Sequence, residues 1–232
     1  MLYPVPAVMV SCGRPEERPN IITVAWAGTV CSSPAMVSIS VRKERYSYDI
    51  LKETGEFVIN LITRDLTYAT DFCGVRSGRD VDKFAQMHLT PLPSQHISAP
   101  GIAESPVNLE CKVTQVIPLG SHDMFLAEVL GVTVDEKYMD VNGKFHLNDA
   151  GLVAYSHGEY FELGEKLGKF GYSVAKKQAA KPESVTKSAK PSGAGKKAAS
   201  AENRTASKTG AGNRRKSASK TGSADKQKSR RK

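Results

Sequence analysis

Short runs rich in Val and Ile, separated by Gly, Pro, Asn and Ser, make up most of the first 60 residues and constrain the fold more than any other feature. Beta-branched residues in short runs bounded by turn formers are typical of β-strands. The pattern predicts strands over residues 5–11, 21–27 and 36–41. A chain that opens in this way is expected to build its core around a β-sheet.

Helical spacing is confined to two short segments. The first covers residues 49–54, with Ser47 as the expected N-cap and Gly55 as the expected C-cap. The second covers residues 63–73 and is expected to end at Gly74. Further strands are predicted over 56–62, 109–118 and 124–134; the last two are joined by a Gly-containing hairpin loop, and Asn142-Gly143 marks another turn. This order favours a mainly β, barrel-like core with a few short peripheral helices.

The composition changes near residue 175. Residues 176–232 hold 18 of the 33 Lys and Arg but 3 of the 24 Asp and Glu, so this segment carries a net charge of +15 and the rest of the chain −6. Because the segment has almost no apolar side chains to offset the entropy of ordering, it is expected to be a disordered tail. The sequence therefore predicts one domain over 1–175 and a basic tail over 176–232, which is either a solvated extension or a contact for nucleic acid or an acidic partner.

The four cysteines are irregularly spaced and form neither a Cys-x-x-Cys motif nor a Cys-His cluster. Neither a zinc site nor a disulfide framework is therefore expected, and buried free thiols are the default. No signal-peptide pattern opens the chain, and no apolar run is long enough to span a membrane. These features favour a cytoplasmic protein without a membrane span.

Seven short motifs occur in a fixed order along the predicted domain. They are Asn20-x-x-Thr23-x-Ala-Trp26, Ser33-Pro-Ala-x-Val-Ser-Ile, Arg45-Tyr-Ser, Gly55-Glu-Phe-Val-Ile-Asn, Ser77-Gly-Arg-Asp-Val-Asp-Lys-Phe, Gly120-Ser-His-Asp and Leu152-Val-Ala-Tyr. In this order they resemble the flavin reductase-like family, and most closely its flavoredoxin branch. The resemblance runs from Pro4 to Ser173, leaves out the basic tail, and implies an FMN-binding split β-barrel.

The resemblance also implies a flavin site. Asn20 would bond the ring or the ribityl chain, Trp26 would offer a flat face, and Lys83 would supply a cation. Ser47, at a helix start, would hold the phosphate. The positions that match the family's flavin contacts are Asn20, Thr23, Trp26, Arg42, Arg45, Ser47, Lys83, His122 and Tyr155. No catalytic residue is assigned, although His122 is a candidate beside the flavin, and no metal is expected.

Each of these residues also has an ordinary structural interpretation. From the residues alone, Trp26 could be a core residue and Ser47 only a helix cap. Lys83 could be a solvated charge on a helix, His122 an exposed loop residue, and Tyr155 a plug in the barrel. These alternatives stay open on the sequence.

The resemblance implies an oxidoreductase that takes electrons from NAD(P)H or a redox partner through bound FMN to an acceptor. Residues 193–198 have the outline of a dinucleotide-binding loop, but they lie in the basic segment without a strand before them, so they are set aside. Nicotinamide would therefore bind transiently at the flavin itself. The alternatives are an electron carrier that nicotinamide does not reduce, and a flavin module tethered by its tail. By resemblance, a homodimer is expected.

Overall fold

The computed structural model describes residues 2–14 and 16–175. Contacts group the chain up to Ser173 into one compact unit. The basic segment 176–232, with the disorder and acidic or nucleic-acid partners predicted for it, lies outside the described residues. Within the described part, none of the helices is both long and apolar enough to cross a lipid bilayer.

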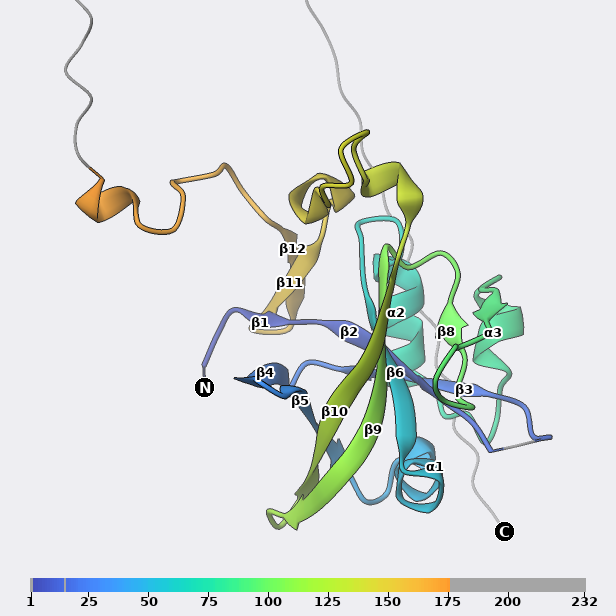
Figure 1. Cartoon of the computed structure of the whole chain (residues 1–232). Helices are drawn as coiled ribbons and strands as arrows, with labels where there is room; N and C mark the ends of the chain where they lie inside the picture. Colours follow the sequence, from blue (N-terminus) through green and yellow to red (C-terminus); the bar gives the residue numbers. More distant parts are fainter. Residues whose placement is uncertain (1, 15, 176–232) are drawn as a thin grey trace, which may run out of the picture. The chain divides into compact units, whose positions relative to one another are not determined.

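Seven antiparallel strands form the central sheet, in the order β3-β2-β6-β9-β10-β5-β4 (Figure 1). The longest pair, β9 and β10, is the hairpin that the sequence predicts. The strands are β2 (Val8–Cys12), β3 (Asn20–Val24), β4 (Ala27–Ser32), β5 (Ala35–Arg42), β6 (Glu56–Leu61), β9 (Val107–Pro118) and β10 (His122–Val134). The mainly β prediction is thus confirmed.

The two outer strands of this sheet, β3 and β4, are joined by only Ala25 and Trp26. Such a link spans at most about 11 Å, whereas the outer strands of a flat seven-stranded sheet would lie about 29 Å apart. The sheet must therefore curl until its edges meet. The backbone N–H of Ser40 in β5 donates to the Trp26 carbonyl at 2.9 Å and anchors the link to β5. The result is the predicted split β-barrel.

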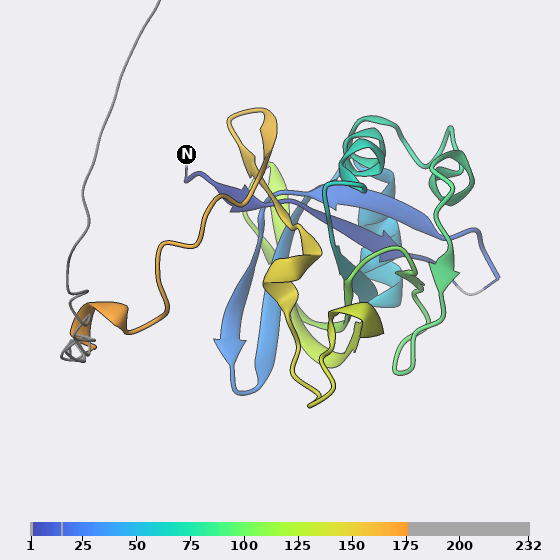
Figure 2. The ribbon, with the colours of Figure 1, turned by 90° about the horizontal axis from the view of Figure 1, so that it is seen from above.

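In the described part of the chain, three α-helices accompany the barrel: α1 (Tyr46–Thr54), α2 (Thr67–Val75) and α3 (Lys83–Gln86). In Figure 2 the hairpin of β4 and β5 lies on the side away from α2 and α3. Gly55 ends α1 as predicted, with φ of +64° and its N–H donating to the Leu51 carbonyl at 3.0 Å.

Three predicted helix boundaries are wrong. The N-cap of α1 is Arg45, not Ser47, and Ser47 lies inside the first turn, where its hydroxyl has another partner. Helix α2 begins at Thr67, not at residue 63, because Thr63 bridges to Leu152 instead. It also runs through Gly74, where a Cβ atom would approach the Thr23 side chain to 3.2 Å. Gly74 therefore lets α2 pack closely on β3 rather than ending the helix.

Two strand predictions are also corrected. The predicted strand over 5–11 breaks at Ala7 into β1 (Val5–Pro6), which pairs with β11, and β2, which pairs with β3 and β6. The strand predicted over 21–27 ends at Val24. The turn at Asn142-Gly143 is confirmed, since Gly143 has φ of +76° and its N–H donates to the Asp140 carbonyl at 2.9 Å.

The remaining elements of the described chain are short. They are β7 (Pro91–Leu92), β8 (Gly101–Ile102), β11 (Val153–Ser156), β12 (Glu159–Glu162), η1 (Glu136–Tyr138), η2 (Leu147–Ala150) and η3 (Tyr172–Val174).

Alternating side chains of the strands build two cores. One includes Val10, Ile39 and Phe125, together with residues of α1. The other includes Met9 and residues of α2 and α3. Because consecutive residues of β2 point to opposite faces, Met9 and Val10 serve different cores.

A buried asparagine fastens the long loop before β9 to the sheet. The Asn60 amide group donates to the Met9 carbonyl at 2.8 Å and to Ser11 Oγ at 3.0 Å. Its carbonyl oxygen accepts from the Ile102 backbone N–H at 2.9 Å. Asn60 is fully buried, so these bonds have no solvent substitute.

Candidate functional site

Two adjoining cavities lie beside β3, where the barrel closes. The first, the helix cavity, has a volume of about 380 Å³ and lies between the start of α1, the end of α2 and α3. The second, the tryptophan cavity, has a volume of about 140 Å³ and lies between the β3–β4 link and the start of β10. Both are lined by Ile22 and Arg45, so they form one continuous site.

The structure brings eight of the nine predicted residues to this site. Asn20, Ser47 and Lys83 line the helix cavity. Thr23, Trp26, Arg42 and His122 line the tryptophan cavity, and Arg45 lines both. Their convergence could not follow from spacing, since they come from β3, β5, α1, α3 and β10.

The helix cavity has a buried polar wall. The Asn20 side-chain amide donates to Ser47 Oγ at 2.7 Å, and both side chains are buried. Gly78 lies against this pair: a Cβ atom there would stand 2.1 Å from Asn20 Oδ1. The absence of a side chain at Gly78 therefore lets Asn20 keep its bond to Ser47.

The start of α1 faces the same cavity, through Arg45, Tyr46 and Ser47. The first N–H groups of an α-helix have no intrahelical acceptor and carry partial positive charge. No side chain caps them here. Together with the Ser47 hydroxyl they form a group of donors suited to a phosphate or carboxylate.

Lys83 is buried in this cavity, with an exposed fraction of 3%. Its ammonium group donates to the Ile21 carbonyl at 2.6 Å and to the Cys73 carbonyl at 2.7 Å. Burial lowers the pKa of Lys83 to about 8, against the smaller opposing effect of the Cys73 and Cys12 thiols. The interpretation as a solvated helix charge is therefore wrong, and Lys83 ties β3 to the end of α2.

Arginines surround the mouth of the helix cavity. Arg45 donates to the Gly74 carbonyl at 3.3 Å, and the Arg79 guanidinium lies 5.4 Å from the centroid of the Tyr46 ring. Arg76 also lines the cavity, and Glu44 is the single acid among its lining residues. The mouth is therefore positively charged. Sequence reasoning missed Tyr46, Arg76, Gly78 and Arg79, although three of them lie within the quoted Arg45-Tyr-Ser and Ser77-Gly-Arg motifs.

Trp26 and His122 form the aromatic wall of the tryptophan cavity. Their ring centroids are 4.5 Å apart, with an angle of 43° between the planes. Trp26 is 45% exposed, so its interpretation as a core residue is wrong. Partial burial, followed by the charge of Arg42, lowers the pKa of His122 below its usual 6.5. His122 is therefore neutral near pH 7, where it can donate or accept a hydrogen bond.

Two predicted residues have other contacts. The Thr23 hydroxyl donates to the Thr70 carbonyl in α2, so it serves the packing of α2 on β3. Tyr155 lies on β11, outside both cavities, where its ring packs edge-on against Tyr3 and Tyr160 at centroid distances of 6.2 and 5.4 Å. Tyr155 therefore does not join the other eight within one chain.

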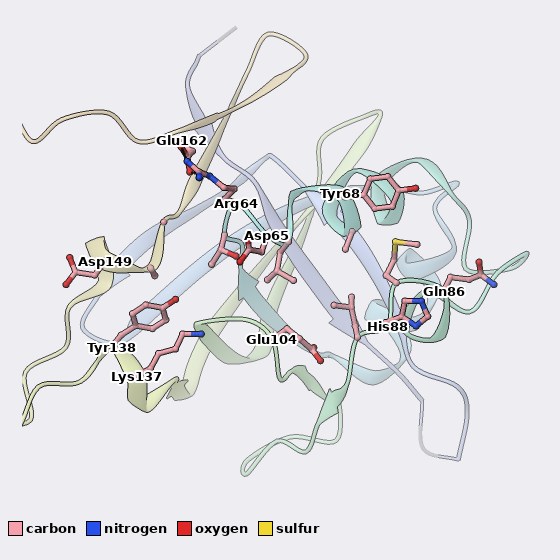
Figure 3. A pocket seen from close by; sticks show the side chains of 17 residues that line it. Arg64, Asp65, Tyr68, Gln86, His88, Glu104, Lys137, Tyr138, Asp149 and Glu162 are labelled. Carbon is pink, nitrogen blue, oxygen red and sulfur yellow. Dashed lines mark hydrogen bonds and ion pairs between the residues drawn. The ribbon is translucent and has the colours of Figure 1, made fainter.

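A larger open cavity of about 870 Å³ lies elsewhere and contains none of the predicted residues. Figure 3 shows Lys137 and Tyr138 on one side of it and Gln86 and His88 on another. Its cations are already paired, Arg64 with Glu162 and Lys137 with Asp135. It therefore offers less free positive charge to an anion than the helix cavity. Among residues 2–14 and 16–175, no cluster of three or more His, Cys, Asp or Glu could hold a metal ion.

Comparisons with known proteins identify relatives of this chain. Residues 1–164 match the family described as flavin reductase like domain. An uncharacterized protein of Archaeoglobus fulgidus is 31% identical over 160 residues, which cover 69% of this chain and 88% of that protein. The structure of the flavoredoxin of Desulfovibrio vulgaris (Miyazaki F) is similar with a TM-score of 0.70 and 34% identity, covering 75% of this chain and 95% of the other.

A flavoredoxin from Methanosarcina acetivorans has the same fold, with a TM-score of 0.67 and 24% identity over 75% of this chain and 95% of its own. The family match covers the whole barrel and both cavities, and the seven motifs lie within it. The chain therefore belongs to the flavin reductase-like family, in its flavoredoxin branch.

Proposed function

We propose that this protein binds FMN in the joined helix and tryptophan cavities and acts as a flavin-dependent oxidoreductase. The observation that carries the proposal is the placement of an anion-binding end next to an aromatic end, in a chain of the flavin reductase-like family. FMN has the same two ends, a phosphate dianion and a flat aromatic ring.

The helix cavity suits the phosphate. The free N–H groups at the start of α1, the Ser47 hydroxyl and the Arg45 guanidinium would hold it. Charge-assisted hydrogen bonds of this kind are about twice as strong as neutral ones. Because Asn20 bonds Ser47, it orients the hydroxyl that would meet the ligand.

The tryptophan cavity suits the ring. Trp26 offers a wide apolar face and one N–H donor, and the neutral imidazole of His122 offers one donor and one acceptor. FMN, when bound, supplies hydride and single-electron transfer, and the protein contributes binding, orientation and electrostatics. The cations Arg42, Arg45 and Lys83 around the site favour the more negative, reduced form of a flavin.

NADH or NADPH is the electron donor in this proposal. The described domain is a single barrel with small helices, and the motifs show no separate dinucleotide-binding unit, so the nicotinamide would bind transiently beside Trp26 and His122. The absorbance spectrum of the purified protein, loaded with FMN and titrated anaerobically with each nucleotide, tests this. Bleaching of the flavin band is expected with at least one of them; a persistently oxidised flavin would exclude the nicotinamide-dependent activity.

The likeness to flavoredoxins favours a second candidate, an electron carrier that a partner protein reduces. Stopped-flow mixing separates the two. Rapid bleaching by NADH or NADPH supports the reductase, whereas bleaching only by a chemical or protein reductant supports the carrier. A folded protein that stays colourless in excess FMN would refute both.

We also propose a homodimer. Apolar side chains are exposed on the barrel surface, among them Val30 on β4 and Val132 on β10. A second copy of the chain would cover such side chains, since homodimer interfaces are more apolar than the rest of a protein surface. Light scattering of the purified chain is expected to give twice the mass of 25.1 kDa; the mass of a single chain would refute it.

A further inference from the structure

The first two residues of β10 point to opposite faces of the sheet. His122 faces the tryptophan cavity, whereas the carboxylate of Asp123 is buried, with an exposed fraction of 4%. Asp123 Oδ2 accepts a hydrogen bond from the Tyr48 hydroxyl at 2.5 Å. Tyr48 belongs to the first turn of α1, so this bond joins the start of the helix to the start of β10.

The three residues that open α1 have three different partners. The Tyr46 ring lies under Arg79, Ser47 bonds Asn20, and Tyr48 bonds Asp123. Tyr48 also packs edge-on against Phe125 of β10, with ring centroids 5.8 Å apart. The orientation of the first helical turn is therefore set from β10 on one side and from β3 on the other.

Burial of this carboxylate is not explained by packing alone. Asp123 Oδ1 is buried and accepts no hydrogen bond, although the half-exposed Lys43 ammonium lies 3.3 Å away. The hydrogen bond from Tyr48, followed by Lys43, lowers the pKa of Asp123, and the same bond raises the pKa of Tyr48 to about 12. At neutral pH the pair is thus a phenol donating to a carboxylate. Burying a charge is costly, and in some proteins a buried polar or ionic group is retained because it fixes one arrangement of the fold.

We propose that Asp123 is a positioning residue of the flavin site, which acts through Tyr48 to hold the start of α1 at a fixed place relative to His122. Ser47 and the free N–H groups of α1 belong to the phosphate end, and His122 belongs to the ring end. The Tyr48–Asp123 bond is the direct polar link between the elements that carry them. This inference rests on the proposed function.

The inference predicts different effects on the binding of two ligands, FMN and riboflavin. Loss of the link loosens the start of α1 on its β10 side, whereas Trp26 and His122 remain held by the barrel strands. Binding of FMN should weaken, and binding of riboflavin, which has the same ring but lacks the phosphate, should not. A merely structural role for the pair would lower both affinities together.

Tyr48→Phe and Asp123→Asn in the full chain test the proposal, with FMN and riboflavin titrated by flavin fluorescence. Each variant is expected to weaken FMN binding by about five- to tenfold, because Tyr48→Phe removes the hydrogen bond and Asp123→Asn removes the charge that strengthens it, and part of that loss reaches the ligand. Riboflavin affinity and the midpoint potential of bound FMN, which report the ring end, are expected to be unchanged. Tyr160→Phe is the matched control, because it removes another tyrosine–aspartate bond, to Asp71 at 3.3 Å, outside both cavities.

Three results would overturn the inference: unchanged FMN affinity in Tyr48→Phe, equal losses for FMN and riboflavin, or an equal loss of FMN affinity in Tyr160→Phe. If Asp123→Asn fails to fold, the milder Tyr48→Phe decides. If the unmodified protein binds neither ligand, the proposed function fails first, and the inference falls with it.

Discussion

Replacement of Lys83 by methionine should change how the stability of this protein depends on pH. Lys83 is buried, and its ammonium group reaches only two backbone carbonyls in the described structure. Methionine has a similar length and no charge, so Lys83→Met keeps the packing and removes the titration. The quantity of interest is the free energy of unfolding of the wild type minus that of Lys83→Met.

The sign follows from the two pKa values of Lys83. In the unfolded chain the ordinary value is 10.5, and in the folded protein burial lowers it to about 8. Between these values the unfolded chain binds more protons, so the stability contributed by Lys83 rises with pH. Below pH 8 both states are protonated, and the buried charge costs about 3 kcal/mol. That cost disappears progressively as the pH rises from 8 to 10.5.

Urea unfolding followed by circular dichroism at pH 7 to 10, in the absence of flavin, measures the difference. The free energy of unfolding of the wild type minus that of Lys83→Met is expected to increase by about 2–3 kcal/mol over this range. Above pH 8 the increase is about 1.4 kcal/mol per pH unit. Burial raises the pKa of Cys12 and Cys111 to about 12 and of Cys73 to about 11, which lowers the stability of both proteins above pH 9. The comparison cancels most of that background, because Lys83 lowers the pKa of Cys12 and Cys73 only as an effect smaller than burial. A constant difference from pH 7 to 10 would refute the reasoning.

Three other perturbations follow from the same structure. Cys31 is the one cysteine that is not fully buried, so in native protein at pH 8 a disulfide reagent should modify one thiol rapidly and the other three only after unfolding; four fast thiols would contradict the described burial. Gly78→Ala should displace Asn20 from Ser47 and weaken FMN binding by about tenfold in a fluorescence titration. Wild-type affinity in this variant would mean that the Asn20–Ser47 bond does not shape the binding site. Asn60→Ala should lower the free energy of unfolding by roughly 3 kcal/mol in urea; a loss under 1 kcal/mol would mean that water replaces its bonds.

The sequence predicted the strands in which every second side chain is apolar and points into a core, such as β5 and β10. It missed β4 (Ala27–Ser32), because Gly28, Cys31 and Ser32 have little β-propensity and the strand is paired on one side only. It also placed Ser47 as a helix cap, since a cap and a first-turn residue differ by two positions and only the partner of the hydroxyl distinguishes them.

The site was found through the order of the motifs rather than through local pattern. The burial of Lys83 could not be read from its neighbours in sequence, because its partners are the carbonyls of Ile21 and Cys73, which tertiary folding brings to it. Likewise, the contact between Trp26 and His122 depends on the closure of the barrel. Tyr155 belongs to one of the seven motifs but lines neither cavity, because β11 joins the sheet of β1 and β12 instead of the barrel.

The short connection between β3 and β4 has an evolutionary consequence. Ala25 and Trp26 both shut the barrel and line the tryptophan cavity, so the seam and the ligand wall are one piece of chain. The register of β4 on β5 is set by their own hairpin turn, so an amino acid added to the link would instead lengthen the seam and separate β3 from β4 beside the tryptophan cavity. Relatives are therefore expected to keep the length of this link, because a change there would alter the closure of the barrel and the wall of the tryptophan cavity together.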